Sequence, residues 1–146
     1  MAQTIFDTNN TVVLINGNII SDLSSDTSIT IAFPNDQMGH VVGMNGGQAL
    51  KTFINGNECN IDLVLLKGSP SDDYLQTFIN ENSVADKVFS ISITEDYYVN
   101  GAARKRFLKS EQAYIKKQAD SAVNGTGTDD LSVTFNIICP NTSRSF

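Results

Sequence analysis

The chain has 146 residues, of which 40% are hydrophobic and 18% are charged, and this composition is ordinary for one globular domain. Its net charge of −6 opposes binding to phosphate backbones at long range. No apolar run approaches the ~20 residues of a membrane-spanning helix, and the start MAQTIFDTNN lacks the basic region and apolar core of a signal peptide. We therefore expect a single domain over 1–146, made in a cytoplasm and without a membrane anchor.

Alternating apolar and polar residues predict antiparallel strands along most of the chain. The segment TVVLING is more uniformly apolar and ends in the turn signal Asn16-Gly17. The segments SITIAF, CNIDLVL, FSISIT and LSVTFNIIC then place an apolar side chain at every second position, as strands do when one face packs on a core. Breakers separate the segments, among them GMNGGQAL, which we interpret as a hairpin turn, and NGTGTDD at 124–130. The fold is therefore predicted to be mainly β.

One short helix is predicted directly after CNIDLVL. Ser69 or Ser71 can accept hydrogen bonds from free backbone N–H groups, and Pro70 stands where a missing donor costs little. Asp72 and Asp73 face the positive end of the helix dipole. The apolar side chains that follow share one stripe at helical spacing: Tyr74, Leu75, Phe78 and Ile79. The helix is expected to cover one end or face of the sheet.

A basic segment interrupts the acidic chain. Residues 104–117 hold six of the ten Lys and Arg residues and one acidic residue. Helix propensity favours a helix here, whereas the strand-rich surroundings favour a long strand. The segment can be a solvated face, a contact with an acidic neighbouring subunit, or a patch for nucleic acid. Its basic residues are Arg104, Lys105, Arg106, Lys109, Lys116 and Lys117.

Patterns that carry catalysis or metal binding are not found in the sequence. The one histidine, His40, has no Cys or second His near it, and GMNGGQAL lacks the Lys and Ser/Thr of a phosphate loop. Cys59 and Cys139 lie in apolar strand patterns; a disulfide is geometrically possible, but a reducing cytoplasm favours two buried thiols. The acid pairs at 72–73, 95–96 and 129–130 are explained by helix capping, a strand end and a turn. We expect no enzyme, no cofactor and no metal site.

Residues 41–82 resemble the tail-tube proteins of contractile-tailed bacteriophages. The resemblance lies in the turn of VVGMNGG, the alternating strand of CNIDLVL and the helix start Ser69-Pro70-Ser71-Asp72-Asp73. The order of the remaining elements also fits, including LINGNII near the start and SISITEDYYVNG, a strand that ends in an acidic turn. That family normally carries a strand where residues 104–118 stand, so the resemblance favours the strand there.

The resemblance implies a fold similar to the tube protein of type VI secretion: two packed antiparallel sheets that form a small barrel or sandwich with one flanking α-helix. Hexameric rings would stack into a tube that conducts phage DNA without binding it specifically, inside a contractile sheath and between baseplate and terminator proteins. Segments 1–10 and 140–146 would be flexible or subunit-contact arms, and the six basic residues above would contact other subunits or the sheath. Polar side chains expected to line the bore are Ser90, Ser92, Thr94, Ser132, Thr134 and Asn136.

Two other functions stay open. A related tail terminator or baseplate ring protein would share the fold without making long tubes. A small DNA-binding domain would use the basic segment 104–117, and its binding would be sensitive to salt. The expected location for the tube protein is the virion, with assembly in the cytoplasm of a bacterial host.

Overall fold

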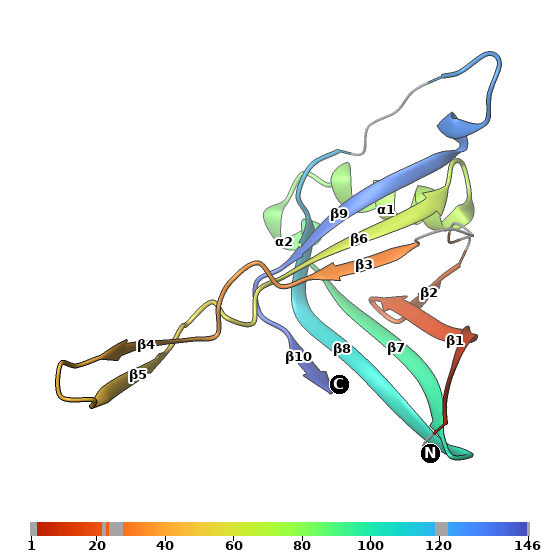
Figure 1. Ribbon diagram of the computed structural model, residues 1–146. Coiled ribbons are helices and arrows are strands. Elements are labelled where there is room, and N and C mark those ends of the chain that lie inside the picture. Colours follow the sequence, from red (N-terminus) through yellow and green to blue (C-terminus); the bar gives the residue numbers. More distant parts are fainter. Residues whose placement is uncertain (1–2, 22, 24–27, 119–122, 146) are drawn as a thin grey trace.

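The computed structural model of the protein describes residues 3–21, 23, 28–118 and 123–145 (Figure 1). Within these ranges the chain forms ten strands, two α-helices and one 3-10 turn. The elements are β1 (Thr4–Ile15), β2 (Asn18–Ile20), β3 (Ile29–Ala32), β4 (Met38–Val42), β5 (Gln48–Thr52), β6 (Cys59–Leu66), α1 (Pro70–Ile79), α2 (Val84–Lys87), β7 (Phe89–Val99), β8 (Ala102–Ile115), η1 (Asp129–Leu131), β9 (Ser132–Cys139) and β10 (Ser143–Ser145).

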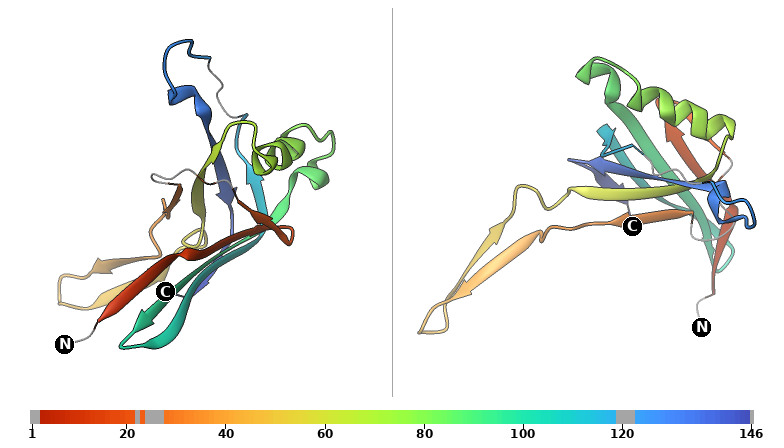
Figure 2. Two further views of the ribbon diagram at one scale, coloured as in Figure 1. Left: turned by 90° about the vertical axis from the view of Figure 1, so that its right-hand side faces the viewer. Right: turned by 90° about the horizontal axis from the view of Figure 1, so that it is seen from above.

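The strands form two antiparallel sheets and a separate hairpin. Sheet A has the order β2-β1-β7-β8, and β10 pairs with the far side of β8. Sheet B has the order β3-β6-β9 and is joined to sheet A by the last residues of β8. Strands β4 and β5 pair only with each other among the described residues, and Figures 1 and 2 show this hairpin projecting away from both sheets.

Strand β8 is shared between the sheets. It pairs with β7 from Ala102 to Ala113, and its last two residues, Tyr114 and Ile115, pair with β9. A bulge precedes the change of partner, because one residue of β7 lies between Phe89 and Ile91 while two residues of β8 lie between Ser110 and Ala113. Bulges bend a strand and increase its twist, which is how a strand turns the corner between two packed sheets.

The core lies between the sheets and is built from alternate residues of each strand. Ile61, Leu63 and Leu65 of β6 are completely buried, and so are Phe135 and Ile137 of β9. From sheet A, the core receives Val13, Ile15, Ile91, Ile93 and Leu108, each with 6% or less of its surface exposed. The period of two in the sequence therefore predicted which side chains are buried, since strand side chains alternate between faces.

Two Asn-Gly turns connect neighbouring strands of sheet A. Asn16 and Gly17 have φ of 50° and 81°, and Asn100 and Gly101 repeat these values in the β7–β8 turn. Positive φ at both central residues is the geometry of the tight turn that matches the twist of a hairpin, and Asn-Gly is its preferred sequence. The Asn16 side chain also accepts a hydrogen bond from the backbone N–H of Ser90 at 2.9 Å, which fastens the first turn to β7.

The predicted mainly-β fold of two packed antiparallel sheets with a flanking helix is confirmed. Of the two forms considered it is the sandwich, because no pairing among the described residues closes the sheets into a barrel. Some details differ from the expectation. A second helix, α2, follows the expected one. Residues 4–10 belong to β1 and residues 143–145 to β10, so these parts of the expected flexible or subunit-contact arms are strands of sheet A, and a contact of either arm with another subunit stays a prediction. Glu95 and Asp96 do not end their strand, which continues to Val99.

The basic segment is a strand. Residues 104–115 lie in β8, as the resemblance implied, and not in a helix. Pairing with β7 on one side and with β10 and β9 on the other overrides the helix propensity of Arg, Lys, Glu and Gln, since propensity is a weak preference that tertiary pairing overcomes.

Helix α1 begins where the sequence predicts it. Ser69 is the N-cap, and its Oγ accepts a hydrogen bond from the backbone N–H of Asp72 at 3.3 Å. Asp72 is buried, and its Oδ2 accepts from the backbone N–H of Gly68 at 2.9 Å. Ser71 has a different task, because its Oγ accepts from the backbone N–H of Ser21 at 3.0 Å. The first turn of α1 is therefore fastened to the segment after β2.

The apolar stripe of α1 completes the core. Leu75 is completely buried, and the Phe78 ring packs on the Phe89 ring with centroids 4.8 Å apart. The Tyr74 hydroxyl donates to the carbonyl oxygen of Ile15 at 3.3 Å. Figure 1 shows both helices behind β6 and β9, so they lie on the core side of sheet B and leave its other face uncovered. No helix among the described residues is long and apolar enough to span a membrane.

Replacing Leu75 with Ala tests how firmly α1 is held in the core. Removing a completely buried leucine side chain leaves a cavity, so the free energy of unfolding should fall by about 2–5 kcal/mol in urea titrations. The exposed neighbour Thr77 is the control, and Thr77→Ala should change it by less than about 0.5 kcal/mol. A loss below about 1 kcal/mol for Leu75→Ala would mean that α1 does not close the core.

Candidate functional site

The six basic residues do not form one patch. Side chains of a strand alternate between faces, so Arg104 and Arg106 point to the inner side of sheet A while Lys105 and Lys109 point to its outer side. Lys116 and Lys117 lie beyond the other end of β8, and the backbone N–H of Lys116 donates to the carbonyl oxygen of Asn136 in sheet B. At ~3.3 Å per residue, about 40 Å of chain separates Arg104 from Lys117.

Strand β7 places acidic residues directly opposite two of the basic ones. Glu95 faces Arg106 on the inner side of sheet A, and Asp96 faces Lys105 on the outer side. Opposite charges in such cross-strand pairs stabilise a hairpin modestly. Part of the basic charge is thus balanced within the same pair of strands, which further weakens the interpretation of 104–117 as a surface for nucleic acid.

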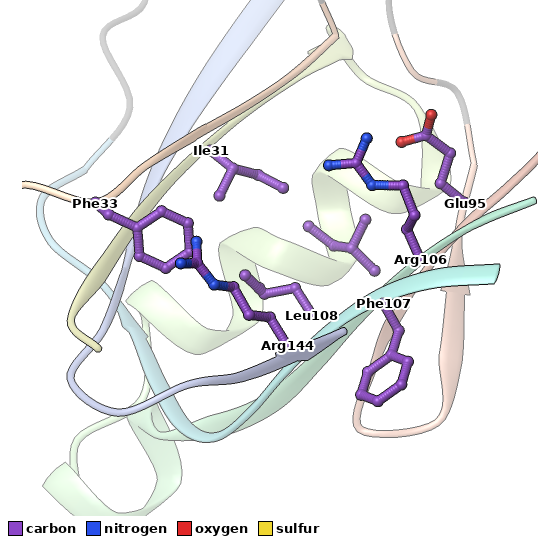
Figure 3. A pocket seen from close by; sticks show the side chains of 8 residues that line it. Ile31, Phe33, Glu95, Arg106, Phe107, Leu108 and Arg144 are labelled. Atoms are coloured by element: carbon purple, nitrogen blue, oxygen red, sulfur yellow. The ribbon is translucent and has the colours of Figure 1, made fainter. Parts of the chain in front are cut away.

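A recess of about 340 Å³ opens between the two sheets where β3 faces β8 and β10. Figure 3 shows Ile31 and Leu108 at its apolar floor, with Arg106 extended toward Glu95 at one end. At the other end the Arg144 guanidinium lies over the Phe33 ring, 4.4 Å from its centroid. Phe107 points away from the recess, on the opposite side of β8. Side chains of this chain already engage both arginines.

The polar residues expected to line one bore lie on two different faces. Ser90, Ser92 and Thr94 alternate with the buried Phe89, Ile91 and Ile93, so they are on the outer face of sheet A. Ser132, Thr134 and Asn136 alternate with the buried Val133, Phe135 and Ile137, so they are on the outer face of sheet B. The core separates the two outer faces. The two groups therefore cannot line the same channel wall, and the expectation holds for one group at most.

The most exposed apolar surface is one that the sequence did not single out. In the hairpin β4–β5, Val41 is 73% exposed, Val42 is 60% exposed and Leu50 is 64% exposed. Met44 at its tip is fully exposed, and every described residue from His40 to Ile54 is classed as exposed. The adjacent pair Val41-Val42 could have indicated this exposed surface from the sequence. Neighbouring residues of a strand point to opposite faces, so one core cannot bury both valines.

Glycines hold the base of this hairpin close together. A Cβ on Gly56 would lie 2.9 Å from the Cα of Gln37, so the two segments that leave the sheets touch at the backbone. A Cβ on Gly39 would lie 2.8 Å from the Phe53 ring, which covers that glycine. The hairpin therefore has a defined base, and beyond Gly39 no described residue covers either of its faces.

A second exposed apolar region lies at the far end of sheet A. The Phe6 and Tyr97 rings stack with centroids 5.3 Å apart, and Phe6 remains 46% exposed. Residues 4–7, 96–99 and 102–105, which we call the distal ribbon, extend past sheet B (Figures 1 and 2). The distal ribbon thus has one aromatic pair on its inner side with no second sheet to cover it.

The remaining reactive side chains do not assemble into a site in the described part of the chain. His40 is exposed on β4, and no group of three or more His, Cys, Asp or Glu residues there could hold a metal ion. Cys59 and Cys139 are direct partners in the pairing of β6 with β9, and both are free, completely buried thiols. Burial raises the pKa of Cys59 to about 11, and burial with the adjacent Cys59 thiol raises that of Cys139 to about 12.

The Glu95–Arg106 pair can be measured by a double-mutant cycle. We expect Glu95→Ala and Arg106→Ala each to lower the free energy of unfolding, and the double variant to lose less than the sum of the two. The difference should be roughly 0.2–1 kcal/mol, because the pair is only half-buried. Lys51 lies opposite Gly39 in the hairpin β4–β5, so no acidic side chain faces it across the strands. Lys51→Ala is therefore the control, and it should leave the free energy of unfolding almost unchanged. If the two losses simply add in the double variant, Glu95 and Arg106 do not interact, and this pair does not balance charge between β7 and β8.

The two thiols predict a loss of stability in alkali. Both pKa values are higher in the folded chain than in the unfolded chain, where a thiol titrates near 8.5. The stability that the neutral thiols contribute is therefore complete below about pH 8.5 and is lost as the pH rises toward 11. Stability measured by urea titration should fall less steeply above pH 9 in a Cys59→Ala, Cys139→Ala variant than in the original chain. Parallel curves would show that the thiols are not responsible.

Likeness to known proteins assigns no function to these surfaces. No model of a protein family matches the chain, and no curated protein matches it.

Proposed function

We propose that the protein is a structural subunit of a phage tail tube. Identical copies form hexameric rings, and the rings stack into a hollow tube that conducts DNA to the host when the sheath contracts. The hexamer and the partners, namely sheath, baseplate and terminator proteins, come from the resemblance of residues 41–82 to tail-tube proteins. In this proposal the chain has no catalytic role, resides in the virion and is assembled in the host cytoplasm.

The observation that carries the proposal is the uncovered hairpin β4–β5. A two-stranded hairpin alone in water is at best marginally stable, and this one exposes Val41, Val42 and Leu50. Large exposed apolar surface is typical of a contact with another protein. A neighbouring copy in the same ring or the next ring is the partner that a self-assembling tube supplies.

The open sandwich supports the same proposal. Among the described residues, no strand pairs with the free side of β3, and β10 covers only Phe107–Lys109 on the free side of β8's first half. Free strand edges invite pairing with other chains, and natural proteins cover or pair them. In a closed ring each edge meets the next copy, so no edge is left for uncontrolled aggregation.

The competing proposal of a DNA-binding domain has less support. Binding to duplex DNA needs several cations on one surface, because each phosphate contact adds to affinity through the release of counterions. Here the basic residues divide between the two sides of sheet A and the far end of β8. Two of them also face acids of β7. Such an arrangement suits contacts between proteins at several places better than one contact with DNA.

Substituting the hairpin tests the proposal. We expect the purified protein at high concentration to form rings or tubes that negative-stain microscopy and sedimentation can detect. A Val41→Lys, Leu50→Lys variant should remain monomeric, because it places charge on both faces of the hairpin. Its free energy of unfolding should change by less than about 1 kcal/mol, since both side chains are exposed in the monomer.

The matched control is Val84→Lys, which changes an equally exposed valine, 80% exposed, on the short helix α2. It should assemble as the original chain does. Rings that never stack would favour a terminator or baseplate ring protein, and salt-sensitive binding to DNA by the monomer would favour the DNA-binding domain. A protein that stays monomeric at every concentration near neutral pH would overturn the proposal.

A further inference from the structure

We propose that the outer face of sheet B is turned to the central channel and that the outer face of sheet A is turned away from it. This inference rests on the proposed tube. It states which of the two groups of polar residues predicted to line the bore faces the channel. The outer face of sheet B carries apolar side chains, among them Val64, Leu66 and Ile138, and six polar ones. We call the part formed by the six polar side chains the polar face: Thr30, Asn60, Asp62, Ser132, Thr134 and Asn136.

The polar face carries short hydrogen-bonding side chains in register across three strands. Thr30 of β3 lies opposite Asp62 of β6, and Asp62 lies opposite Asn136 of β9. Lys116 follows beside Asn136, because its backbone N–H donates to the Asn136 carbonyl oxygen at 2.9 Å. Asp62 and Lys116 are the only charges in this row of four, and they have opposite sign. A nearly neutral wall of small polar groups offers phosphates little to bind, which suits DNA that must slide past.

Three oxygen atoms on this face have no hydrogen-bond donor. They are the Oδ1 atoms of Asn60, Asp62 and Asn136, and neighbouring atoms shield each of them in the single chain. The outer face of sheet A has one such atom among the described residues, the Oδ1 of Asp96. A shielded acceptor that stays without a donor costs about 1–3 kcal/mol, and a protein packed on the polar face without supplying donors would keep water from relieving that cost. Water can supply the donors after small movements of exposed neighbours such as Thr134. These oxygens therefore favour a water-filled space beside the polar face over a dry protein contact.

The outer face of sheet A has a different chemistry. Thr94 lies opposite Phe107, Ser92 lies opposite Lys109, and Asp96 lies opposite Lys105. Val12 and Leu14 of β1 continue the first two of these rows, opposite Thr94 and Ser92. Both outer faces hold apolar side chains, so the lysines make the difference. Lys105 and Lys109 would hold phosphates in a channel by releasing counterions, whereas the row on the polar face has one lysine, Lys116. This face is therefore better suited to the outside of the tube or to a neighbouring protein.

Cysteine labelling of assembled tubes tests the orientation. The variants are Thr134→Cys on the polar face and Lys109→Cys on the outer face of sheet A, and both positions are exposed in the single chain. Each is treated with a small maleimide and with a maleimide on a polymer too bulky to enter the channel. The native Cys59 and Cys139 are completely buried, and the original chain measures their background.

In monomers, both variants should react with both reagents. In tubes, the bulky reagent should label the Thr134→Cys variant at least about tenfold more slowly than in monomers, while the small reagent still labels it. For the Lys109→Cys variant, the rate of labelling by the bulky reagent should fall less between monomers and tubes than it does for the Thr134→Cys variant. The variants Thr30→Cys and Ser92→Cys repeat the comparison if either first substitution prevents folding.

The outcomes separate this inference from the proposed function. Tubes in which the Lys109→Cys variant is the protected one, or in which both variants are equally accessible to the bulky reagent, would overturn the orientation and leave the tube intact. Loss of reaction with both reagents at Thr134→Cys would place the polar face in a protein contact and also overturn it. Absence of any ring or tube would overturn the proposed function, and the orientation with it.

Discussion

Strand β8 pairs with β7 along most of its length and with β9 at Tyr114 and Ile115, so its backbone must bend where the partner changes. The bulge near Glu111 and Gln112 provides that bend. Because one continuous strand joins the sheets, they meet at this corner, and the core fills the space between their inner faces. The shared strand therefore determines which side chains are buried, which faces point outward, and where each sheet extends alone.

The same strand determines the distribution of charge. If residues 104–117 formed a helix, at about 100° per residue five of their six cations would fall within an arc of about 120° and would make one basic stripe. As a strand, the segment sends Arg104 and Arg106 to one side of sheet A and Lys105 and Lys109 to the other. Secondary structure, and not composition, thus decides that the chain has several small basic sites and no basic patch.

The hairpin β4–β5 and the distal ribbon both extend beyond the core and carry exposed apolar side chains, Val41 and Leu50 in one and Phe6 in the other. A chain that only had to fold would gain nothing from these extensions, because each exposes apolar surface and adds strand edges to water. Their presence is understandable if stability is completed by contacts with further copies. The recess at Arg106 and Arg144 differs, because side chains of the same chain already engage its charged groups.

Local patterns in the sequence were enough to predict most of the strands and the start of the first helix. The period of two identified the buried side chains of β6, β7 and β9, the Asn-Gly pairs identified two tight turns, and Ser69 with Pro70 identified the start of α1. Each of these signals acts over a few residues, through alternation of side chains, positive φ or capping of free N–H groups. No local pattern predicts that β7 and β9 belong to different sheets, so that Ser92 and Thr134 face different spaces. That outcome depends on which distant strands pair and on the bend in β8, and alternation within a strand has the same appearance whichever sheet the strand joins.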